Sequence, residues 1–331
     1  MRSSTTLPKT VFFVLALCLC GCHARNHDGF TIAVIPKTTA TNVWKSMHIA
    51  ILEDAKNYPC KIEWNAPESE ADYTQQASMV EDAVYRHVSG IILAPDHQLV
   101  LASSVKLAKE AGIPVVILDA PISLPTDDYT AFIGSDDVEI GALAADRIGL
   151  KLHGSGQVGI IGVSPTLEGS NRREDAFIQR LKERFPQIVV VDIEYGLSDW
   201  ARSSRAAQDM VDKYPKLDAM FVSDGFATSG AASVLEAHRS VRHIVLVGVD
   251  QEGYTLQAVR EGLVDSVIVK DSNTMGHLAM LTMMAALQHK PFNKRLYVPV
   301  ALITQREVDS PQLKRLLPPH FVSPVNAPPS R

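Results

Sequence analysis

The stretch VLASSVKLAKEAGIPVVILDA, Val100–Ala120, contains one repeating unit of the fold. Its first half places apolar residues three and four positions apart, which is typical of an amphipathic helix. Gly112 and Pro114 end that pattern, and a continuous apolar run follows as far as Asp119. A continuous run of Val and Ile is typical of a strand that is buried on both faces in a parallel sheet. The stretch therefore predicts a helix, then a buried strand that ends on an acid.

The same alternation of strand and helix extends in both directions along the chain. Further buried strands are predicted at TIAVIP (31–36), GIILAP (90–95), TAFIGSD (130–136), QVGIIGV (157–163), IVVVDIEY (188–195), AMFVSDG (219–225), HIVLVGVD (243–250) and DSVIVKD (265–271). Further helices are predicted at 46–58, 75–88, 172–185, 205–214, 229–240 and 255–263. Such alternation predicts right-handed βαβ units in doubly wound parallel sheets. Because the strands are too many for one sheet, we expect two α/β lobes.

The first residues of the chain predict export and attachment of a lipid. Two basic residues precede an apolar run from Val11 to Gly21, which has the length of a secretory signal and is too short to span a membrane. The end of this run, LCGC, resembles a bacterial lipobox. It predicts a lipoprotein signal peptide over 1–21 and lipidation of Cys22. The alternative is an ordinary cleaved signal of which Cys22 is simply the last residue.

Composition restricts the kind of site that the mature chain can carry. With a lipid on Cys22, Cys60 would be the only free thiol, so no intramolecular disulfide could form. Removal of residues 1–21 would leave 310 of the 331 residues and change the net charge from −5 to −7. An acidic chain without a basic run is a poor binder of nucleic acid. The eleven histidines lack the spacing of metal ligands, so we expect no metal site.

Three predicted strands end on an acid, at Asp119, Asp224 and Asp250. Ligands of open α/β sheets bind beyond the carboxyl ends of the strands, and a carboxylate accepts hydrogen bonds from two neighbouring hydroxyl groups. Each of these acids can instead cap a helix or form a turn. Trp44 and Trp200 lie where a loop enters a helix, where an aromatic face can stack on a sugar ring or cover an edge of the core.

Together these segments resemble the periplasmic sugar-binding proteins of the ribose-binding type, the type I solute-binding proteins of ABC importers. The resemblance covers about Thr31 to Val308. It rests on TIAVIPKTTATNVWKSM (31–47), GIPVVILDA (112–120), NRREDAF (171–177), VSDGFATSGA (222–231) and LVGVDQ (246–251). It implies the periplasmic binding protein-like I fold, in which two doubly wound parallel-sheet lobes are joined by a three-stranded hinge.

The resemblance also implies where each lobe begins and ends. An N-terminal lobe would comprise 27–133 plus 271–299, and a C-terminal lobe 134–270 plus 300–315. The chain would cross between them near Ile133, Lys270 and Val300. The Pro-rich tail, 316–331, is expected to be extended.

A ligand site between the lobes follows from the same resemblance. Two tryptophans would stack on the ligand, two acids would accept from its hydroxyl groups, and Arg173 would donate to it, unless Arg173 forms an i, i+4 pair on a helix surface. The ligand-binding residues implied in this way are Trp44, Asp119, Arg173, Trp200, Asp224, Asp250 and Lys270.

Four positions of this site depart from the family pattern. Asp224 stands at an Asn position and Lys270 at a Gln position. Ala120 replaces the arginine that commonly follows the first acid, and Val43 stands where a second aromatic is frequent. The sequence therefore does not choose between a plain aldopentose and an amino sugar, a polyol or another modified monosaccharide as the ligand.

The function implied is that of the substrate-binding lipoprotein of an ABC importer, which captures such a ligand by hinge closure. It would be a monomer without cofactor or catalytic activity. It would sit in the periplasm or cell envelope, held to the membrane by the lipid on Cys22, and deliver its ligand to an ABC permease in the inner membrane. We expect Asp119→Ala and Asp250→Ala to abolish binding with little change in melting temperature.

Three other functions remain possible on such a fold. A ligand-sensing protein would pass its closed state to a membrane receptor or sensor kinase. A transcriptional regulator would need a helix-turn-helix where this chain has a secretion signal. A secreted enzyme would need a nucleophile–base pair or a metal cluster, and the sequence contains no recognisable example.

Overall fold

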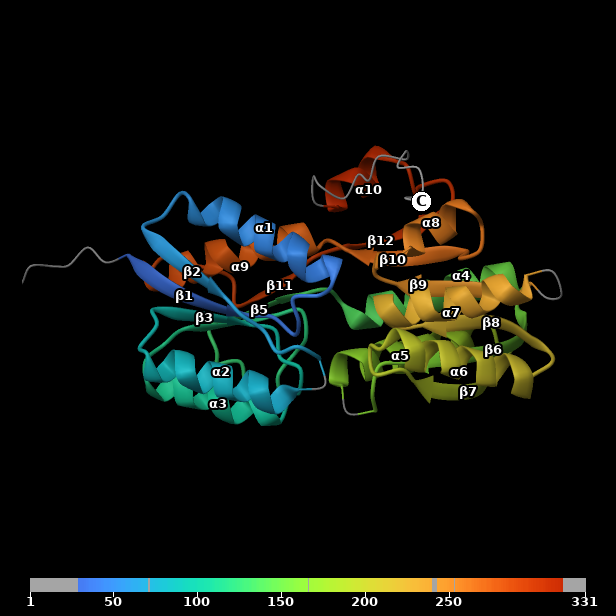
Figure 1. Ribbon diagram of the computed structural model, residues 1–331, viewed down its shortest axis with the longest axis horizontal. Coiled ribbons are helices and arrows are strands. Elements are labelled where there is room, and N and C mark those ends of the chain that lie inside the picture. Colours follow the sequence, from blue (N-terminus) through green and yellow to red (C-terminus); the bar gives the residue numbers. More distant parts are fainter. Residues whose placement is uncertain (1–28, 71, 166, 240–242, 253, 318–331) are drawn as a thin grey trace, which may run out of the picture.

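The computed structural model describes residues 29–317, apart from 71, 166, 240–242 and 253. The predicted lipidation site Cys22 and nearly all of the predicted tail lie outside the described residues. The described part forms two lobes side by side along the long axis of the molecule (Figure 1). Each lobe contains one six-stranded sheet.

The first lobe has a parallel sheet in the order β11-β5-β4-β3-β1-β2. Its elements are β1 (Phe30–Ile35), α1 (Asn42–Ala55), β2 (Cys60–Trp64), α2 (Tyr73–Tyr85), β3 (Gly90–Leu93), α3 (Val100–Glu110), β4 (Val115–Leu118), β5 (Ala131–Gly134), α9 (Ser272–Leu287) and β11 (Arg295–Tyr297). Successive residues of β1 face opposite helix layers. Ile32 and Val34 pack with α1 and α9, whereas Ala33 and Ile35 pack with α2 and α3.

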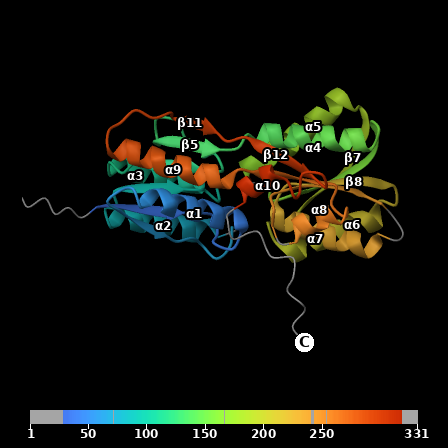
Figure 2. The same ribbon diagram turned by 90° about the horizontal axis from the view of Figure 1, so that it is seen from above.

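The second lobe has a sheet in the order β12-β10-β9-β8-β6-β7. Its elements are α4 (Asp137–Lys151), β6 (Ser155–Gly162), α5 (Glu168–Arg184), β7 (Gln187–Tyr195), α6 (Trp200–Lys213), β8 (Leu217–Val222), α7 (Gly225–His238), β9 (Val245–Val249), α8 (Thr255–Arg260), β10 (Ser266–Lys270), β12 (Val300–Thr304) and α10 (Pro311–Leu316). Met220 and Val222 of β8 face α6 and α7, whereas Ala219 and Phe221 face α4 and α5. Figure 2 shows these helix layers on opposite sides of the sheet.

Within the described residues the chain passes between the two sheets at 134–137, 270–272 and 297–300. β5, β10 and β11 end at these passages, so the carboxyl ends of the parallel strands of both sheets face the region between the lobes. β12 enters the second sheet from that region and therefore runs antiparallel to β10. A ligand at the usual position for an α/β sheet would contact both lobes.

The predicted fold class, two α/β lobes built on mostly parallel sheets, is confirmed. All nine predicted strands are present, together with three that were not predicted, β2, β11 and β12. α4, α9 and α10 were also not predicted. None of the described helices combines the length and the apolar character that a bilayer span requires. Cys60 is a free thiol.

Candidate ligand-binding site

A cavity of about 70 Å³ lies between the lobes, beyond the carboxyl ends of their strands. One ordered water needs roughly 10–15 Å³, so the cavity has room for roughly five to seven groups of the size of a water molecule. Six of the seven predicted ligand-binding residues line it. They are Trp44, Asp119, Arg173, Asp224, Asp250 and Lys270. That they bind a ligand stays a prediction.

Asp119 is the centre of a buried ionic network. Its Oδ2 atom lies 3.0 Å from Lys37 Nζ, and its Oδ1 atom lies 3.0 Å from Lys270 Nζ. Lys270 Nζ is also 3.2 Å from Asp250 Oδ2. Burial opposes the charge of Asp119, but Lys270 and Lys37 hold its pKa well below the ordinary range. Burial likewise opposes the charge of Lys270, but Asp119 and Asp250 raise its pKa above the ordinary value.

This network changes one expectation about stability. The sequence predicts that Asp119→Ala leaves the melting temperature almost unchanged. In the structure that substitution would leave Lys37 without its carboxylate and Lys270 with only the longer contact to Asp250. Removing one partner of a buried ion pair is strongly destabilising, so the expectation for Asp119 is revised.

The two acids are held in equivalent places in the two lobes. Asp119 follows β4, and its N–H donates to Ile133 O of the neighbouring β5 at 2.8 Å. Asp250 follows β9, and its N–H donates to Ile268 O of the neighbouring β10 at 2.9 Å. Both have left-handed backbone geometry, with φ of 65° and 63°, which Asp adopts more readily than most residues. The backbone thus turns sharply at each strand end, where the acid lines the cavity.

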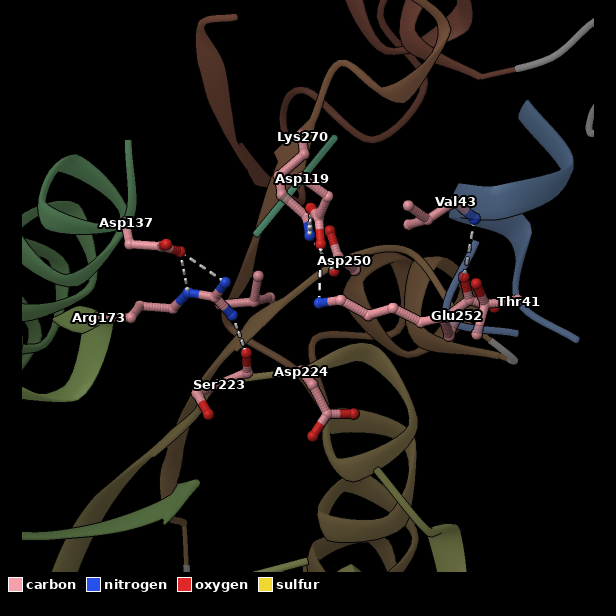
Figure 3. A network of polar contacts seen from close by, with 12 residues as sticks. Thr41, Val43, Asp119, Asp137, Arg173, Ser223, Asp224, Asp250, Glu252 and Lys270 are labelled. Atoms are coloured by element: carbon pink, nitrogen blue, oxygen red, sulfur yellow. Dashed lines mark hydrogen bonds and ion pairs between the residues drawn. The ribbon is translucent and has the colours of Figure 1, made fainter. Parts of the chain in front are cut away.

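Arg173 of α5 is buried and lines the cavity from the second lobe. Its Nη2 and Nε atoms donate to Asp137 Oδ1 at 2.8 and 3.2 Å, and Nη1 donates to Ser223 O. Burial opposes its charge, but Asp137 and Asp250 hold the pKa of Arg173 above its ordinary value. The alternative of a pair on the helix surface is therefore wrong. Figure 3 shows the Arg173–Asp137 pair on one side of the acids and Glu252 on the other.

Asp224 combines two of the roles that the sequence left open. Its Oδ1 atom caps α7 by accepting from Ala227 N at 3.1 Å. Its Oδ2 atom is buried and has no hydrogen-bond partner within the described part of the chain, as is also true of Asp250 Oδ1. Burial raises the pKa of Asp224 to about 7, against the stabilising bond from Ala227 N. The cavity therefore presents two acceptors that a ligand could satisfy.

Glu252 joins the second lobe to the first. Its Oε1 atom accepts from Asn42 N at 2.7 Å and from Val43 N at 3.2 Å, which are the first residues of α1. Asn42 Nδ2 also donates to Gln251 O at 3.4 Å. Free N–H groups at a helix N-terminus attract an anion. Burial raises the pKa of Glu252 to about 8, against these two main-chain bonds.

The structure places the predicted aromatic residues differently. Trp44 is 3% exposed; it lines the cavity and also packs in the core of the first lobe. Trp200 does not line the cavity, which corrects its predicted stacking role. It begins α6 after the cap Asp199, and 47% of its surface is exposed. Phe226, in the first turn of α7, is the aromatic that lines the cavity from the second lobe.

Several lining residues were not predicted from the sequence. Lys37 follows β1 and Glu252 follows Asp250 by two positions, so both lie just beyond strand ends. Searching these positions for any charge, rather than for acids that end a strand, would have identified them. Asp137 begins α4, a helix that was not predicted. Among the described residues no group of His, Cys, Asp and Glu could hold a metal ion.

Comparison with known proteins relates the whole arrangement to one family. Residues 32–291 match a family model described as periplasmic binding protein domain. The ribose import binding protein RbsB of Bacillus subtilis is 24% identical over 285 residues, which is 85% of this chain and 89% of that protein. The putative rhizopine-binding protein of Rhizobium meliloti is 24% identical over 71% of this chain and 77% of its own length.

A solved structure has the same two-lobed fold. It is an ABC transporter solute binding protein from Agrobacterium vitis with bound D-fucose. The two structures superpose with a TM-score of 0.83 at 26% identity, over 87% of this chain and 99% of that chain.

Proposed function

The chain belongs to the periplasmic binding protein family, and we propose that it captures a monosaccharide, or a related polyol or amino sugar, for an ABC importer. Its relatives are binding proteins and not enzymes. The proposal is supported by a relative named for ribose import and by a structural neighbour that holds D-fucose.

The observation that carries the proposal is one small cavity that polar side chains from both lobes line. A sugar needs acceptors and donors around its rim and apolar contact on its ring faces. Asp224 and Asp250 supply buried acceptor oxygens that have no partner among the described residues, and Arg173 and Lys37 supply donors. Phe226 supplies an aromatic surface at the same cavity.

Capture would proceed by closure of the two lobes. A ligand that bonds to groups of both lobes stabilises the state in which the lobes meet, because only that state satisfies all of those bonds. The contact between Glu252 and the start of α1 belongs to the same state, since its partners lie on different lobes. An ABC permease would recognise this state, and a lipid on Cys22 would keep the protein at the membrane.

A thermal-shift screen of monosaccharides, polyols and amino sugars tests this function. A ligand at 100 times its Kd adds about 2.7 kcal/mol to the free energy of unfolding, which is a clear rise in melting temperature. Asp250→Asn should remove the rise, whereas the matched change at exposed Asp209 of α6 should not. The proposal fails if no member of the screen raises the melting temperature of the unaltered protein.

A further inference from the structure

We infer that the ligand carries a cationic amino group, which is held between Asp224 and Asp250. The inference rests on the proposed function and narrows its ligand class to an amino sugar or an aminated cyclitol. Three features of the cavity support it: the balance of charge, the two acceptors without partners, and the position of those acceptors on neighbouring strands.

The first feature is an excess of acids over cations around the cavity. Among the described residues, the lining cations are Lys37, Arg173 and Lys270, and the lining acids are Glu70, Asp119, Asp137, Asp224, Asp250 and Glu252. All three cations are already engaged, since they bond to Asp119, Asp137 and Asp250. Among the described residues, none of these three cations forms an ion pair with the remaining acids Glu70, Asp224 and Glu252.

The second feature is a pair of carboxyl oxygens without partners. Asp250 is 7% exposed, and its Oδ1 atom has no hydrogen-bond partner in the described part of the chain. Asp224 Oδ2 is in the same condition. A buried acceptor without a donor costs free energy, and a buried charge without a partner costs more. Both oxygens belong to side chains that line the cavity, so a ligand can supply what is missing.

The third feature is that the two acids lie close to each other. They follow β8 and β9, which are neighbouring parallel strands. Thr228 Oγ1 links Asp224 to the end of β9, because it donates to Asp224 O and accepts from Val249 N at 3.3 Å. A Cβ atom on Gly225 would lie 3.3 Å from the Cβ atom of Asp250. Both acids therefore lie at the same edge of the second sheet and line the same cavity.

An ammonium group fits this place better than a hydroxyl group does. It has three donors, no acceptor and one positive charge, so it can bond to both free oxygens and offset their charge. A hydroxyl group has one donor and no charge. It can therefore bond to only one of the two free carboxyl oxygens, and it does not offset the negative charge. Without a cation a proton substitutes for it, in line with the pKa of about 7 to which burial raises Asp224.

Calorimetric titration with matched ligand pairs tests the inference at neutral pH. Each pair differs by one amino group in place of a hydroxyl: glucosamine with glucose, galactosamine with galactose, and an aminated inositol with the parent inositol. N-acetylglucosamine keeps the nitrogen and removes its charge. We expect at least one amine to bind about tenfold or more tighter than its hydroxyl partner, and acetylation to abolish the difference.

Two variants identify the position of the amino group. Asp224→Asn keeps an oxygen to cap α7 but removes the charge. It should weaken binding of the preferred amine by about 10- to 100-fold and weaken binding of its hydroxyl partner less, because only the amine loses an ion pair. Asp209→Asn on the exposed face of α6 makes the same change of net charge and should leave both affinities unaltered. In the unaltered protein, amine binding should release a proton from Asp224, so its measured enthalpy should depend on the buffer.

The outcomes separate this inference from the function on which it rests. If hydroxyl sugars bind as tightly as their amines, the inference is overturned and the sugar-binding proposal stands. If Asp224→Asn keeps the preference for the amine, the assigned position is overturned. If no ligand of either set binds the unaltered protein, both proposals are overturned.

Discussion

The contact between Glu252 and α1 makes ligand affinity dependent on one side chain that need not touch the ligand. Glu252→Ala removes the acceptor that Asn42 N and Val43 N share across the two lobes. Glu252→Gln keeps an acceptor oxygen of the same reach but cannot ionise. Comparing the two variants separates the hydrogen bonds from the titration of the carboxyl group.

The expected loss for the Ala variant follows from the two bonds. Because the pKa of about 8 leaves this carboxyl mostly protonated at neutral pH where the lobes meet, each bond contributes about 0.5–1.5 kcal/mol. A loss of about 1–3 kcal/mol for the two bonds corresponds to ligand affinity weakened about 5- to 100-fold. The Gln variant should stay within about threefold of the unaltered protein at neutral pH, because it still accepts from the helix.

The same residue predicts a dependence on pH with a definite sign. In an open form that exposes Glu252, its pKa is near the ordinary value of 4.5, and where the lobes meet burial raises the pKa to about 8. Closure then takes up a proton, so affinity falls as pH rises between these values, by at most about tenfold per pH unit. Asp224, whose pKa burial raises to about 7, also titrates near neutral pH. The contribution of Glu252 is therefore taken as the difference between the unaltered protein and Glu252→Gln, in which Asp224 is unchanged.

Calorimetric titration of the best ligand from the screen, at several pH values, measures both effects. The slope of affinity against pH is compared between the unaltered protein and Glu252→Gln from pH 7 to pH 8. Titration of the ligand itself affects both proteins equally and does not contribute to the difference. The reasoning is refuted if Glu252→Ala binds as tightly as the unaltered protein, or if Glu252→Gln keeps the full slope.

Two further predictions concern stability and location. Asp119→Asn should lower the free energy of unfolding in urea by about 3–5 kcal/mol at neutral pH, because Lys37 and Lys270 lose a buried carboxylate; a loss below about 1 kcal/mol would contradict the network. Since the pKa of Asp119 is held below its ordinary value of 3.8, the unaltered protein should lose this stabilisation as pH falls below about 4, and the variant should have none to lose. Cys22→Ser should move the protein from the membrane to the soluble fraction on cell fractionation, and continued sedimentation with membranes would count against the lipid anchor.

The fold was predictable where burial is uniform along a segment. β4 and β9 are apolar throughout because helices cover both faces of their sheets, so a continuous run identifies each of them. β2 is at the edge of its sheet and only partly buried, so CKIEW lacks such a run. α9 is apolar on most sides because it packs on the first sheet and on α1, and its sequence shows no polar face. Local pattern fails when neighbours from distant parts of the chain decide burial.

The site was predictable where the strand end itself carries the acid. Asp119 and Asp250 follow directly from the rule for carboxyl ends of strands. Lys37 could not be assigned as the partner of Asp119, because the two are joined only by tertiary contact between residues 82 positions apart. Trp200 was assigned to the site although it does not line the cavity, since a position between a loop and a helix does not fix which way the side chain faces.

The most direct measurement is a crystal structure of the protein with the tightest ligand from the screen. We predict the ligand in the cavity between the lobes, with hydrogen bonds to Asp250 Oδ1 and Asp224 Oδ2 and contacts to groups of both lobes. A ligand bound elsewhere, or one that contacts a single lobe and leaves these two oxygens without a partner, would contradict the account.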